Sequence, residues 1–376
     1  MTMTGLTRRT FLGAAAGAGA ATVLGSQLAS AATTPKGCFA GGTVYIGSYT
    51  SGATGHGLDV TTRSGAALNP VRTVPGITDT SWFDRSADGR TLYVTNEGDP
   101  DGYVSALNIA DPAKPKLINR VSSKGGAPTH LSVHSSGKYV LAANYSSGSV
   151  VVLPILAGGK LGAATDLVTH HADSGQAHAH QVVNDPTGRW VLAVDLGADS
   201  VYVYSLTAGK LSLHQQLKLP AGAGPRHLAF DRSGKFAYIL QELRPEVTVA
   251  SWDAAAGTLK ALSVVPAVPA GSTGELYPGE IILSRDGKFA YATVRGPNTL
   301  ATFSVSGATL KLVSTVPTGG NWPRHVALDP SESWFYVSNQ RSGTVTWLPR
   351  DPATGLPGAV AGQLAVGSVN SVYFAS

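Results

Sequence analysis

The feature that most constrains the fold is a strand–turn–strand unit that recurs along the chain. Its clearest copy runs from Pro225 to Glu242, where alternating apolar residues lead into the turn Asp231–Gly234 and a second β-rich run follows. The equivalent turns are 48, 51, 46, 53 and 45 residues apart and contain Gly89, Gly137, Gly188, Gly234, Gly287 and Glu332. Self-similarity at this period, in units rich in strand formers, indicates a β-propeller.

The two ends of the repeat region are incomplete in complementary ways. Thr43–Thr50 forms a strand pattern with no first strand before it, and Asn370–Phe374 resembles a first strand with no second after it. Because a propeller leaves no long sheet edge open, we expect the C-terminal strand to pair with the N-terminal strands. The sequence therefore predicts an all-β fold, a seven-bladed β-propeller formed as one domain by residues 43–376. The 45 glycines and 22 prolines suit a fold with so many turns.

Residues 1–31 have the features of an export signal. Thr7–Leu12 contains paired arginines followed by Phe-Leu, an Ala/Gly-rich run extends to Leu28, and Ala29–Ala31 fits a cleavage site. The arginine pair and the weak hydrophobicity favour twin-arginine export over an ordinary secretory signal or a membrane anchor. We therefore expect a secreted or extracytoplasmic protein, with no membrane association after signal removal and a flexible lead-in over residues 32–42.

Composition argues against several classes of partner. The formal net charge is +5 without a run of Lys or Arg, so nucleic acid is not expected. Cys38 is the single cysteine, which excludes an internal disulfide. The pairs His170-His171 and His178/His180 invite a metal interpretation, but only Asp173 lies near them as an acidic partner, so no metal is expected. No nucleotide- or dinucleotide-binding motif follows a suitable strand. The sequence does not determine the oligomeric state.

Aligning the units on their turns predicts a cluster of polar residues at one end of a central channel. The first strand of each blade lines the channel, and the two ends of a hairpin share one face of the disc. Residues eight before the turn, or at the end of the second strand, are therefore expected to meet at the channel mouth. The candidates for substrate contact are His180, Arg226, Arg324, Glu242, Arg295, Glu97, Asn144 and Gln340. Asn144 occupies a position, seven residues after the turn, that is Asn in several units. Asn there is also compatible with a structural role in turns.

Three of the first strands carry a histidine directly after the mouth position: His130, His227 and His325. Successive side chains of a strand point to opposite sides. We therefore expect these histidines to face away from the residue before each of them, and to hydrogen-bond between blades.

Three arginines at one mouth suggest an anion site. Converging guanidinium groups are costly unless they serve an anion, although a purely structural network with Glu242 and Glu97 is the alternative. Arginine suits a carboxylate or phosphate because two parallel N–H bonds match its fork. Glu242 and His180 are placed for proton transfer.

The sequence resembles the lactonase family of seven-bladed propellers, which includes bacterial 6-phosphogluconolactonases and fungal carboxymuconate lactonising enzymes. The resemblance covers residues 43–376. It rests jointly on the motifs Val44–Thr50, His178–His180, Gly224–His227, Gln241–Leu243, Arg295–Asn298 and Pro323–His325 before Asn339-Gln340. It implies an active site of His180, Arg226, Glu242 and Arg295 that works without a metal or organic cofactor. An export signal is unusual for an enzyme whose phosphorylated substrate stays in the cytosol, and Ser331–Ser333 replaces a glycine turn in the sixth unit.

These observations lead to a functional expectation with two alternatives. The first is an exported lactonase that hydrolyses an anionic lactone, in which Arg226 and Arg295, with Arg324, hold the substrate and Glu242 or His180 is the general base. The second is a cofactor-free cycloisomerase that runs ring closure at the same site. The third is a propeller that binds a ligand or a protein without catalysis.

Overall fold

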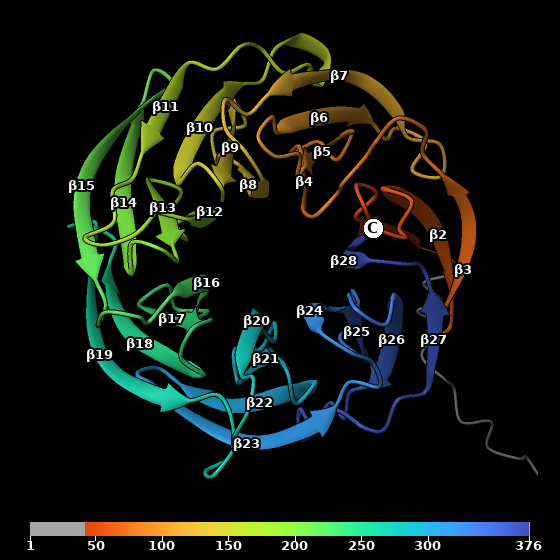
Figure 1. Ribbon diagram of the computed structural model, residues 1–376, viewed down its shortest axis with the longest axis vertical. Coiled ribbons are helices and arrows are strands. Elements are labelled where there is room, and N and C mark those ends of the chain that lie inside the picture. The colour runs from red at the N-terminus through yellow and green to blue at the C-terminus, as the bar shows by residue number, and fades with distance from the viewer. Residues whose placement is uncertain (1–41, 376) are drawn as a thin grey trace, which may run out of the picture. The chain divides into compact units, whose positions relative to one another are not determined.

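The computed structural model describes residues 42–375, which form seven four-stranded antiparallel sheets around a central axis (Figure 1). This confirms the predicted all-β, seven-bladed propeller. The one helical element of the described chain is a short 3₁₀ turn at Ala157–Gly159. The predicted export signal over residues 1–31, and all but the last residue of the predicted lead-in, lie outside the described residues.

The first three blades follow one another along the chain, and each contributes its first strand to the channel wall (Figure 1). Blade 1 comprises β4 (Phe83–Arg85), β5 (Thr91–Asn96), β6 (Tyr103–Asn108) and β7 (Lys116–Ser122). Blade 2 comprises β8 (Pro128–Val133), β9 (Tyr139–Asn144), β10 (Ser149–Pro154) and β11 (Asp166–Thr169). Blade 3 comprises β12 (Ala179–Asn184), β13 (Trp190–Asp195), β14 (Ser200–Thr207) and β15 (Lys210–Lys218).

The next three blades repeat the same order from the axis outward. Blade 4 comprises β16 (Pro225–Phe230), β17 (Phe236–Gln241), β18 (Glu246–Asp253) and β19 (Thr258–Pro266). Blade 5 comprises β20 (Tyr277–Leu283), β21 (Phe289–Arg295), β22 (Thr299–Ser306) and β23 (Thr309–Pro317). Blade 6 comprises β24 (Pro323–Leu328), β25 (Trp334–Asn339), β26 (Thr344–Pro349) and β27 (Gly362–Ala365).

Blade 7 closes the ring by joining the two ends of the chain. Its innermost strand is β28 (Val369–Phe374), which pairs antiparallel with β1 (Thr43–Ser48). The sheet continues outward through β2 (Leu58–Ser64) and β3 (Ala67–Thr73). This pairing confirms the predicted closure and leaves the first strand of the repeat region without an open edge.

The repeated turns have the backbone geometry that their sequences indicate. At Gly234 the chain takes φ +66° and the amide donates to the carbonyl of Asp231, 3.0 Å away. Glu332 occupies the same place in blade 6 with φ +55° and donates to Asp329 over 2.8 Å. A glutamate therefore adopts the left-handed conformation that glycine supplies elsewhere, so the departure in the sixth unit leaves the turn intact.

A buried aromatic side chain near the start of the second strand ties several blades to the next one. The hydroxyl groups of Tyr45, Tyr93, Tyr238, Tyr291 and Tyr336 each donate to a backbone carbonyl at distances of 2.7–3.1 Å. Blade 3 uses the indole N–H of Trp190, which donates to Ala254 of blade 4 over 2.9 Å. These bonds satisfy the polar atom of each buried ring and fix the rotation of one blade relative to the next.

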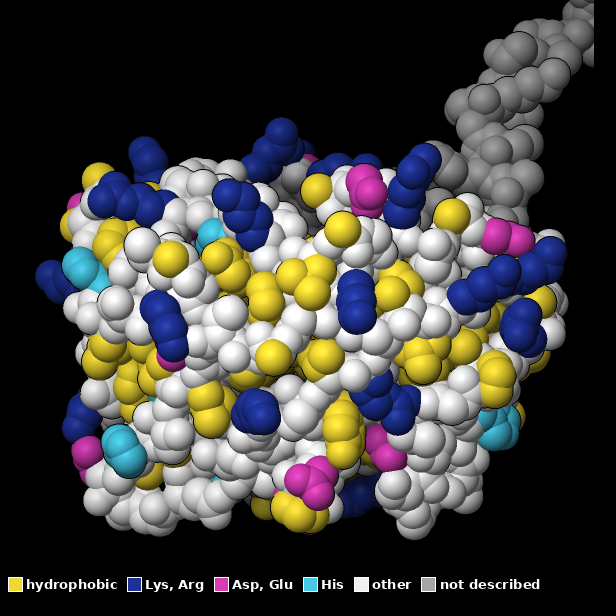
Figure 2. All heavy atoms as spheres, turned by 90° about the horizontal axis from the view of Figure 1, so that it is seen from above, with side chains coloured by type: hydrophobic (Ala, Val, Ile, Leu, Met, Phe, Trp, Pro, Cys, Tyr) yellow, Lys and Arg dark blue, Asp and Glu magenta, His cyan; other side chains and the backbone are white. Residues whose placement is uncertain are grey.

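The outer strands form a wall of mixed character. Large apolar side chains such as Val71, Leu117, Leu213 and Val313 are exposed there, as alternation on a half-buried strand predicts. On the face seen in Figure 2, Lys and Arg are dispersed among apolar and uncharged residues. No helix within residues 42–375 is long and apolar enough to cross a membrane.

Candidate active site

Six of the seven innermost strands have a β-bulge at the level where the charged residues lie. In β16 the register with β17 shifts between Pro225 and His227, which leaves Arg226 as the extra residue. Corresponding shifts occur in β8, β12, β20, β24 and β28. A bulge breaks the strict alternation of side chains and re-aims the ones beside it.

This bulge overturns one expectation about the histidines. His227 and His325 were expected to face away from Arg226 and Arg324, but all four side chains line one small cavity in the channel. The extra residue of the bulge re-aims the side chains beside it. His130, next to the same bulge in β8, does not border this cavity whereas Thr129 does, so for His130 the expectation is not overturned. The expected hydrogen bonding between blades is confirmed.

Those inter-blade bonds run from one innermost strand to the next. His227 Nδ1 lies 2.8 Å from Oε1 of Glu280 in blade 5. The amides of Val182 and Val372 donate over 3.5 Å to Nδ1 of His130 and His325 respectively. The histidines therefore form part of the joint between blades as well as the wall of the channel.

At the mouth, Glu242 joins two arginines from neighbouring blades. Its Oε2 lies 2.9 Å from Nη2 of Arg295 and 3.0 Å from Nε of Arg226. The contact with Arg226 is an ion pair without an aligned hydrogen bond, since Nε makes none. Arg295 is held in turn by the carbonyls of Tyr277 and Pro278, at 2.9 and 2.8 Å.

The opposite charges of Glu242 and its two arginines partly offset the free-energy cost of burying these groups. Burial raises the pKa of Glu242, but Arg295 and Arg226 outweigh it and hold the pKa below its ordinary value. Burial, followed by the neighbouring charges of Arg324 and Arg295, lowers the pKa of Arg226 to about 9 in spite of Glu242. Glu242 is therefore a carboxylate at neutral pH. The charged form of Arg226 is disfavoured by burial, and an additional negative charge nearby would stabilise it.

Arg324 and Glu97 form a second, looser pair on the other side of the mouth. Arg324 Nη2 lies 3.8 Å from Oε1 of Glu97, and the guanidinium lies 5.8 Å from the ring centre of Tyr49. Burial raises the pKa of Glu97 in spite of Arg324, and its Oε2 is buried without a hydrogen-bond partner. Of the three mouth arginines, Arg324 thus has the least closely paired guanidinium.

His180 lies beside these cations on the channel wall. It is 4% exposed, and Tyr145 packs edge-on against it with ring centroids 5.7 Å apart. Burial, then Arg226, pushes the pKa of His180 well below its ordinary value, so the ring is neutral at pH 7. With Arg226, Arg324 and Thr129 it borders a cavity of about 10 Å³, space for about one water molecule.

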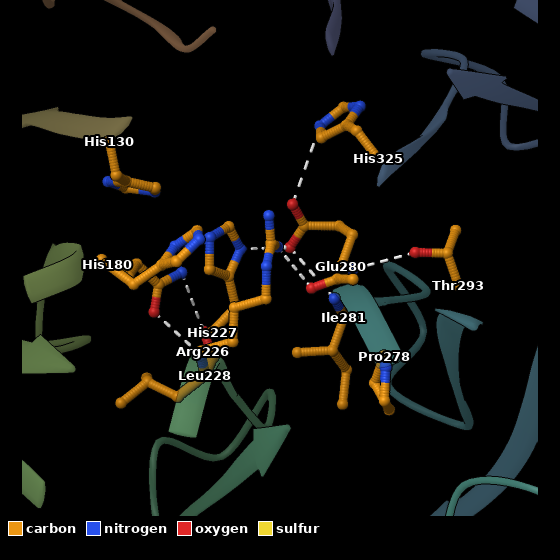
Figure 3. A network of polar contacts seen from close by, with 12 residues as sticks. His130, His180, Arg226, His227, Leu228, Pro278, Glu280, Ile281, Thr293 and His325 are labelled. Atoms are coloured by element: carbon orange, nitrogen blue, oxygen red, sulfur yellow. Dashed lines mark hydrogen bonds and ion pairs between the residues drawn. The ribbon is translucent and has the colours of Figure 1, made fainter. Parts of the chain in front are cut away.

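Below this cavity, Trp82, Glu280 and His325 form the waist of the channel, because they also border the larger cavity of about 570 Å³. Figure 3 shows His130, His180, Arg226, His227, Glu280 and His325 converging in the channel; Arg226 and His227 come from β16, and the others from β8, β12, β20 and β24. Trp82 contacts His130, His227 and His325 with ring centroids 4.2, 5.3 and 5.4 Å apart. The charged mouth is thus separated from the opposite face of the disc by packed rings and one carboxylate.

Two of the predicted substrate-binding residues are placed differently from the rest. Asn144 is fully buried, and its Nδ2 donates to the carbonyl of Ser123 and to Oγ of Ser149 at 3.0 and 3.1 Å. It therefore belongs to the interior of blade 2, as the structural interpretation of this Asn position implies. Gln340 follows β25 at the mouth end. Its backbone N–H donates to the carbonyl of Trp322 over 3.0 Å, and its side-chain Oε1 is buried without a hydrogen-bond partner.

The histidines that suggested a metal site are used otherwise. Both ring nitrogens of His170 are occupied, by Asp195 at 2.7 Å and by the hydroxyl of Tyr204 at 2.9 Å. His178 stacks on Tyr145 with ring centroids 4.4 Å apart. Among the described residues, no group of three or more His, Cys, Asp or Glu side chains is placed to hold a metal ion.

Sequence reasoning did not single out three residues that the structure brings to this region: Tyr49, Glu280 and Trp322. Glu280 occupies the position in β20 that His227 occupies in β16, directly after the mouth position. That equivalence was the sequence signal that could have identified it. Trp322 precedes β24 with φ +66° and lies 5.4 Å from the guanidinium of Arg295. Such a conformation is unusual for a bulky residue, but it cannot be read from the sequence.

The arrangement has the chemical means for acid–base chemistry on an anion. Three guanidinium groups can bind a carboxylate or phosphate and stabilise a developing oxyanion. A neutral imidazole and a carboxylate, His180 and Glu242, lie within the same constellation and can accept protons. Six of the eight predicted contact residues thus meet through direct pairs or a shared cavity: His180, Arg226, Arg324, Glu242, Arg295 and Glu97.

Comparison with known proteins agrees with this architecture. A 6-phosphogluconolactonase of Bacillus subtilis is 32% identical over 321 residues, which cover 83% of this chain and 92% of that protein. A 6-phosphogluconolactonase of Pectobacterium carotovorum is 35% identical over 71% of this chain and 79% of its own length. The solved structure of a periplasmic gluconolactonase of Pseudomonas aeruginosa superimposes with a TM-score of 0.83 at 32% identity, covering 89% of this chain and 99% of that one.

The family model described as "Lactonase, 7-bladed beta-propeller" matches residues 43–374, which is nearly the whole described chain. The match spans all seven blades and every residue of the charged mouth. The chain belongs to the lactonase family of seven-bladed β-propellers.

Proposed function

We propose that this protein is an exported lactonase that hydrolyses an anionic lactone at the channel mouth. The observation that carries the proposal is the excess of guanidinium groups over carboxylates there. Arg226 and Arg295 share one oxygen of Glu242, and Arg324 stands 3.8 Å from Glu97. Buried cations in excess of their partners favour a ligand that brings a carboxylate or a phosphate. The named lactonases among its relatives support the same reaction.

In this mechanism the arginines bind and polarise the substrate. Arg324 and Arg226 hold its anionic group, and Arg295 donates to the carbonyl oxygen as negative charge develops on it. A water molecule attacks the carbonyl carbon, a general base takes its proton, and the ring C–O bond breaks. The same proton then passes to the departing ring oxygen, giving a hydroxy acid that ionises to a carboxylate.

His180 is the better general base of the two candidates. Oε2 of Glu242 is already engaged by two guanidinium groups, at 2.9 and 3.0 Å, so it is a poor acceptor for a further proton. His180 is neutral, and no carboxylate of the mouth is paired with it. Glu242 instead fixes the orientation of Arg226 and Arg295. Substituting His180→Gln should lower kcat by about 10²–10⁴-fold, whereas Glu242→Gln should mainly raise KM.

Export is proposed on the sequence of residues 7–31, with its arginine pair and Ala-Ser-Ala cleavage pattern. A relative named as periplasmic is consistent with it. Fractionation of cells that carry the full chain tests this, with Arg8→Lys/Arg9→Lys as the matched variant. Processed protein outside the cytoplasm for the natural chain, and its loss in the variant, is the expected result.

A panel of lactones tests the activity with the purified mature protein. Phosphorylated and carboxylated sugar lactones should be hydrolysed faster than a neutral lactone of the same ring size, and inorganic phosphate should inhibit competitively. Ring closure of an unsaturated dicarboxylate, found by product analysis, would assign a cycloisomerase instead. Tight anion binding by calorimetry without any turnover would leave a binding protein.

A further inference from the structure

Beside the small cavity of the channel, two imidazole nitrogens are buried without a hydrogen-bond partner. They are Nδ1 of His180 and Nε2 of His227. The two residues are 4% and 1% exposed, so water does not compensate freely for the missing bonds. Buried polar atoms of this kind are uncommon and call for an explanation.

The two rings are close enough to satisfy each other. Their centroids lie 5.0 Å apart, which suits two imidazoles joined edge to edge by one N–H···N bond of about 2.9 Å. In Figure 3 the ring of His227 lies between that of His180 and the carboxylate of Glu280. The planes of the two imidazole rings are inclined at 67°, so rotation of one ring would be needed to pair the two nitrogens.

The far side of His227 is fixed by Glu280. Nδ1 of His227 lies 2.8 Å from Oε1 of Glu280, which also accepts the amide of Ile281 over 3.0 Å. A carboxylate there requires His227 to carry its proton on Nδ1, and so leaves Nε2 as an acceptor. That acceptor selects the Nδ1–H form of His180, whose Nε2 is then free to take a proton.

We infer that Glu280 and His227 are positioning residues that set the tautomer of His180 and thereby make its Nε2 the general base. The inference rests on the proposed hydrolytic function, because it assigns how that base is oriented. It places a carboxylate and two histidines from blades 5, 4 and 3 in one line that ends at the mouth. The logic is that of a catalytic triad, in which a buried carboxylate orients the imidazole that handles the proton.

The groups around this line act on it in opposite directions. The charged and titratable groups that surround the line are the guanidiniums of Arg226, Arg295 and Arg324, the carboxylates of Glu242 and Glu97, and the imidazoles of His130 and His325. The three arginines disfavour an imidazolium at His180. Glu280 is the carboxylate that contacts the two histidines of this line, through Nδ1 of His227. Burial raises the pKa of Glu280, and His325 and Arg226 oppose that rise. In its ionised form Glu280 stabilises a protonated base at the other end of the line.

Kinetics of conservative variants test the inference. Glu280→Gln keeps the shape and removes the charge, so kcat should fall about tenfold with little change in KM. The acid limb of the kcat/KM profile should move to lower pH, because the imidazolium loses its stabilising carboxylate. His227→Phe keeps the ring and removes the acceptor, and should lower kcat by about 10²-fold.

The matched control is His130→Phe. His130 is buried in the same ring of residues and also packs on Trp82, but it borders only the larger cavity. It should resemble His227→Phe in thermal stability while retaining activity. Equal losses of activity in the two variants, or an acid limb unmoved in Glu280→Gln, would overturn the inference.

A spectroscopic test does not depend on turnover. In ¹⁵N-resolved NMR spectra of the folded protein, His180 and His227 should both be neutral Nδ1–H tautomers, and His180 should lose that preference in His227→Phe. An Nε2–H form of His180 in the natural protein would overturn the inference even if lactones are hydrolysed. Conversely, a protein that hydrolyses no lactone but shows the expected tautomers would refute the proposed function and leave only the orientation of His180 by His227 and Glu280 in place.

Discussion

Two buried polar clusters in this propeller contain the same kinds of residue but differ in how completely they are bonded. Between blades 2 and 3, His170 bridges Asp195 and Tyr204, and the other oxygen of Asp195 accepts the amides of His178 and Ala198 at 2.8 Å each. In the channel, by contrast, one atom of each of Glu97, His180, His227 and Glu280 is buried without a partner.

The difference indicates which cluster stabilises the fold and which one serves a ligand. A closed network gains from every hydrogen bond and costs little to bury. In the channel cluster, polar atoms are buried without hydrogen bonds, which costs free energy. A stable protein tolerates this cost where a substrate or a transferred proton supplies the missing bonds. Substitutions in the channel should therefore change activity, and substitutions in the closed cluster should change stability.

The largest effect is expected from Arg226→Ala. Removing a buried, paired guanidinium should cost about 2–5 kcal/mol of transition-state stabilisation, measured as the fall in kcat/KM on the best lactone. Arg232→Ala is the control, since this exposed arginine lies at the distal turn of the same blade. If kcat/KM were nearly unchanged in a folded Arg226→Ala protein, the channel cluster would not be the one that serves activity.

The next effect concerns the stability of the channel cluster in acid. Burial lowers the pKa of His325 from 6.5 to about 4, so between these values the unfolded chain binds a proton that the folded one does not. The free energy of unfolding should therefore decrease as pH falls from 6.5 to 4, by up to about 3 kcal/mol from this residue. His325→Gln should flatten that dependence in urea titrations, and exposed His214→Gln should not.

A smaller effect is expected in the closed cluster. Tyr204→Phe removes one hydroxyl and leaves Nε2 of His170 without its donor, which should lower the free energy of unfolding by about 1–2 kcal/mol. Activity per folded molecule should be unchanged. Tyr103→Phe, at an exposed tyrosine, is the matched control in the denaturation series. A loss of activity in Tyr204→Phe would show that the two clusters are coupled.

Sequence reasoning succeeded where a local pattern repeats. The spacing of the turns predicted six complete blades, and the incomplete ends predicted a seventh, closed by β28 on β1. The same alignment placed Arg226, Glu242 and Arg295 together, because equivalent positions of a repeat occupy equivalent places around the axis. It misjudged His227, because alternation along a strand assumes a regular ladder and a bulge adds one residue to it.

The sequence by itself determined the blade count, the ring closure and the set of charged residues at the mouth. All three follow from the regular spacing of turn residues between strand-forming segments. Only the tertiary structure decided which of these residues pair, that Asn144 is buried inside blade 2, and that His227 lies between His180 and Glu280. Those outcomes depend on the bulges and on contacts between side chains roughly 50 residues apart, which local patterns do not encode.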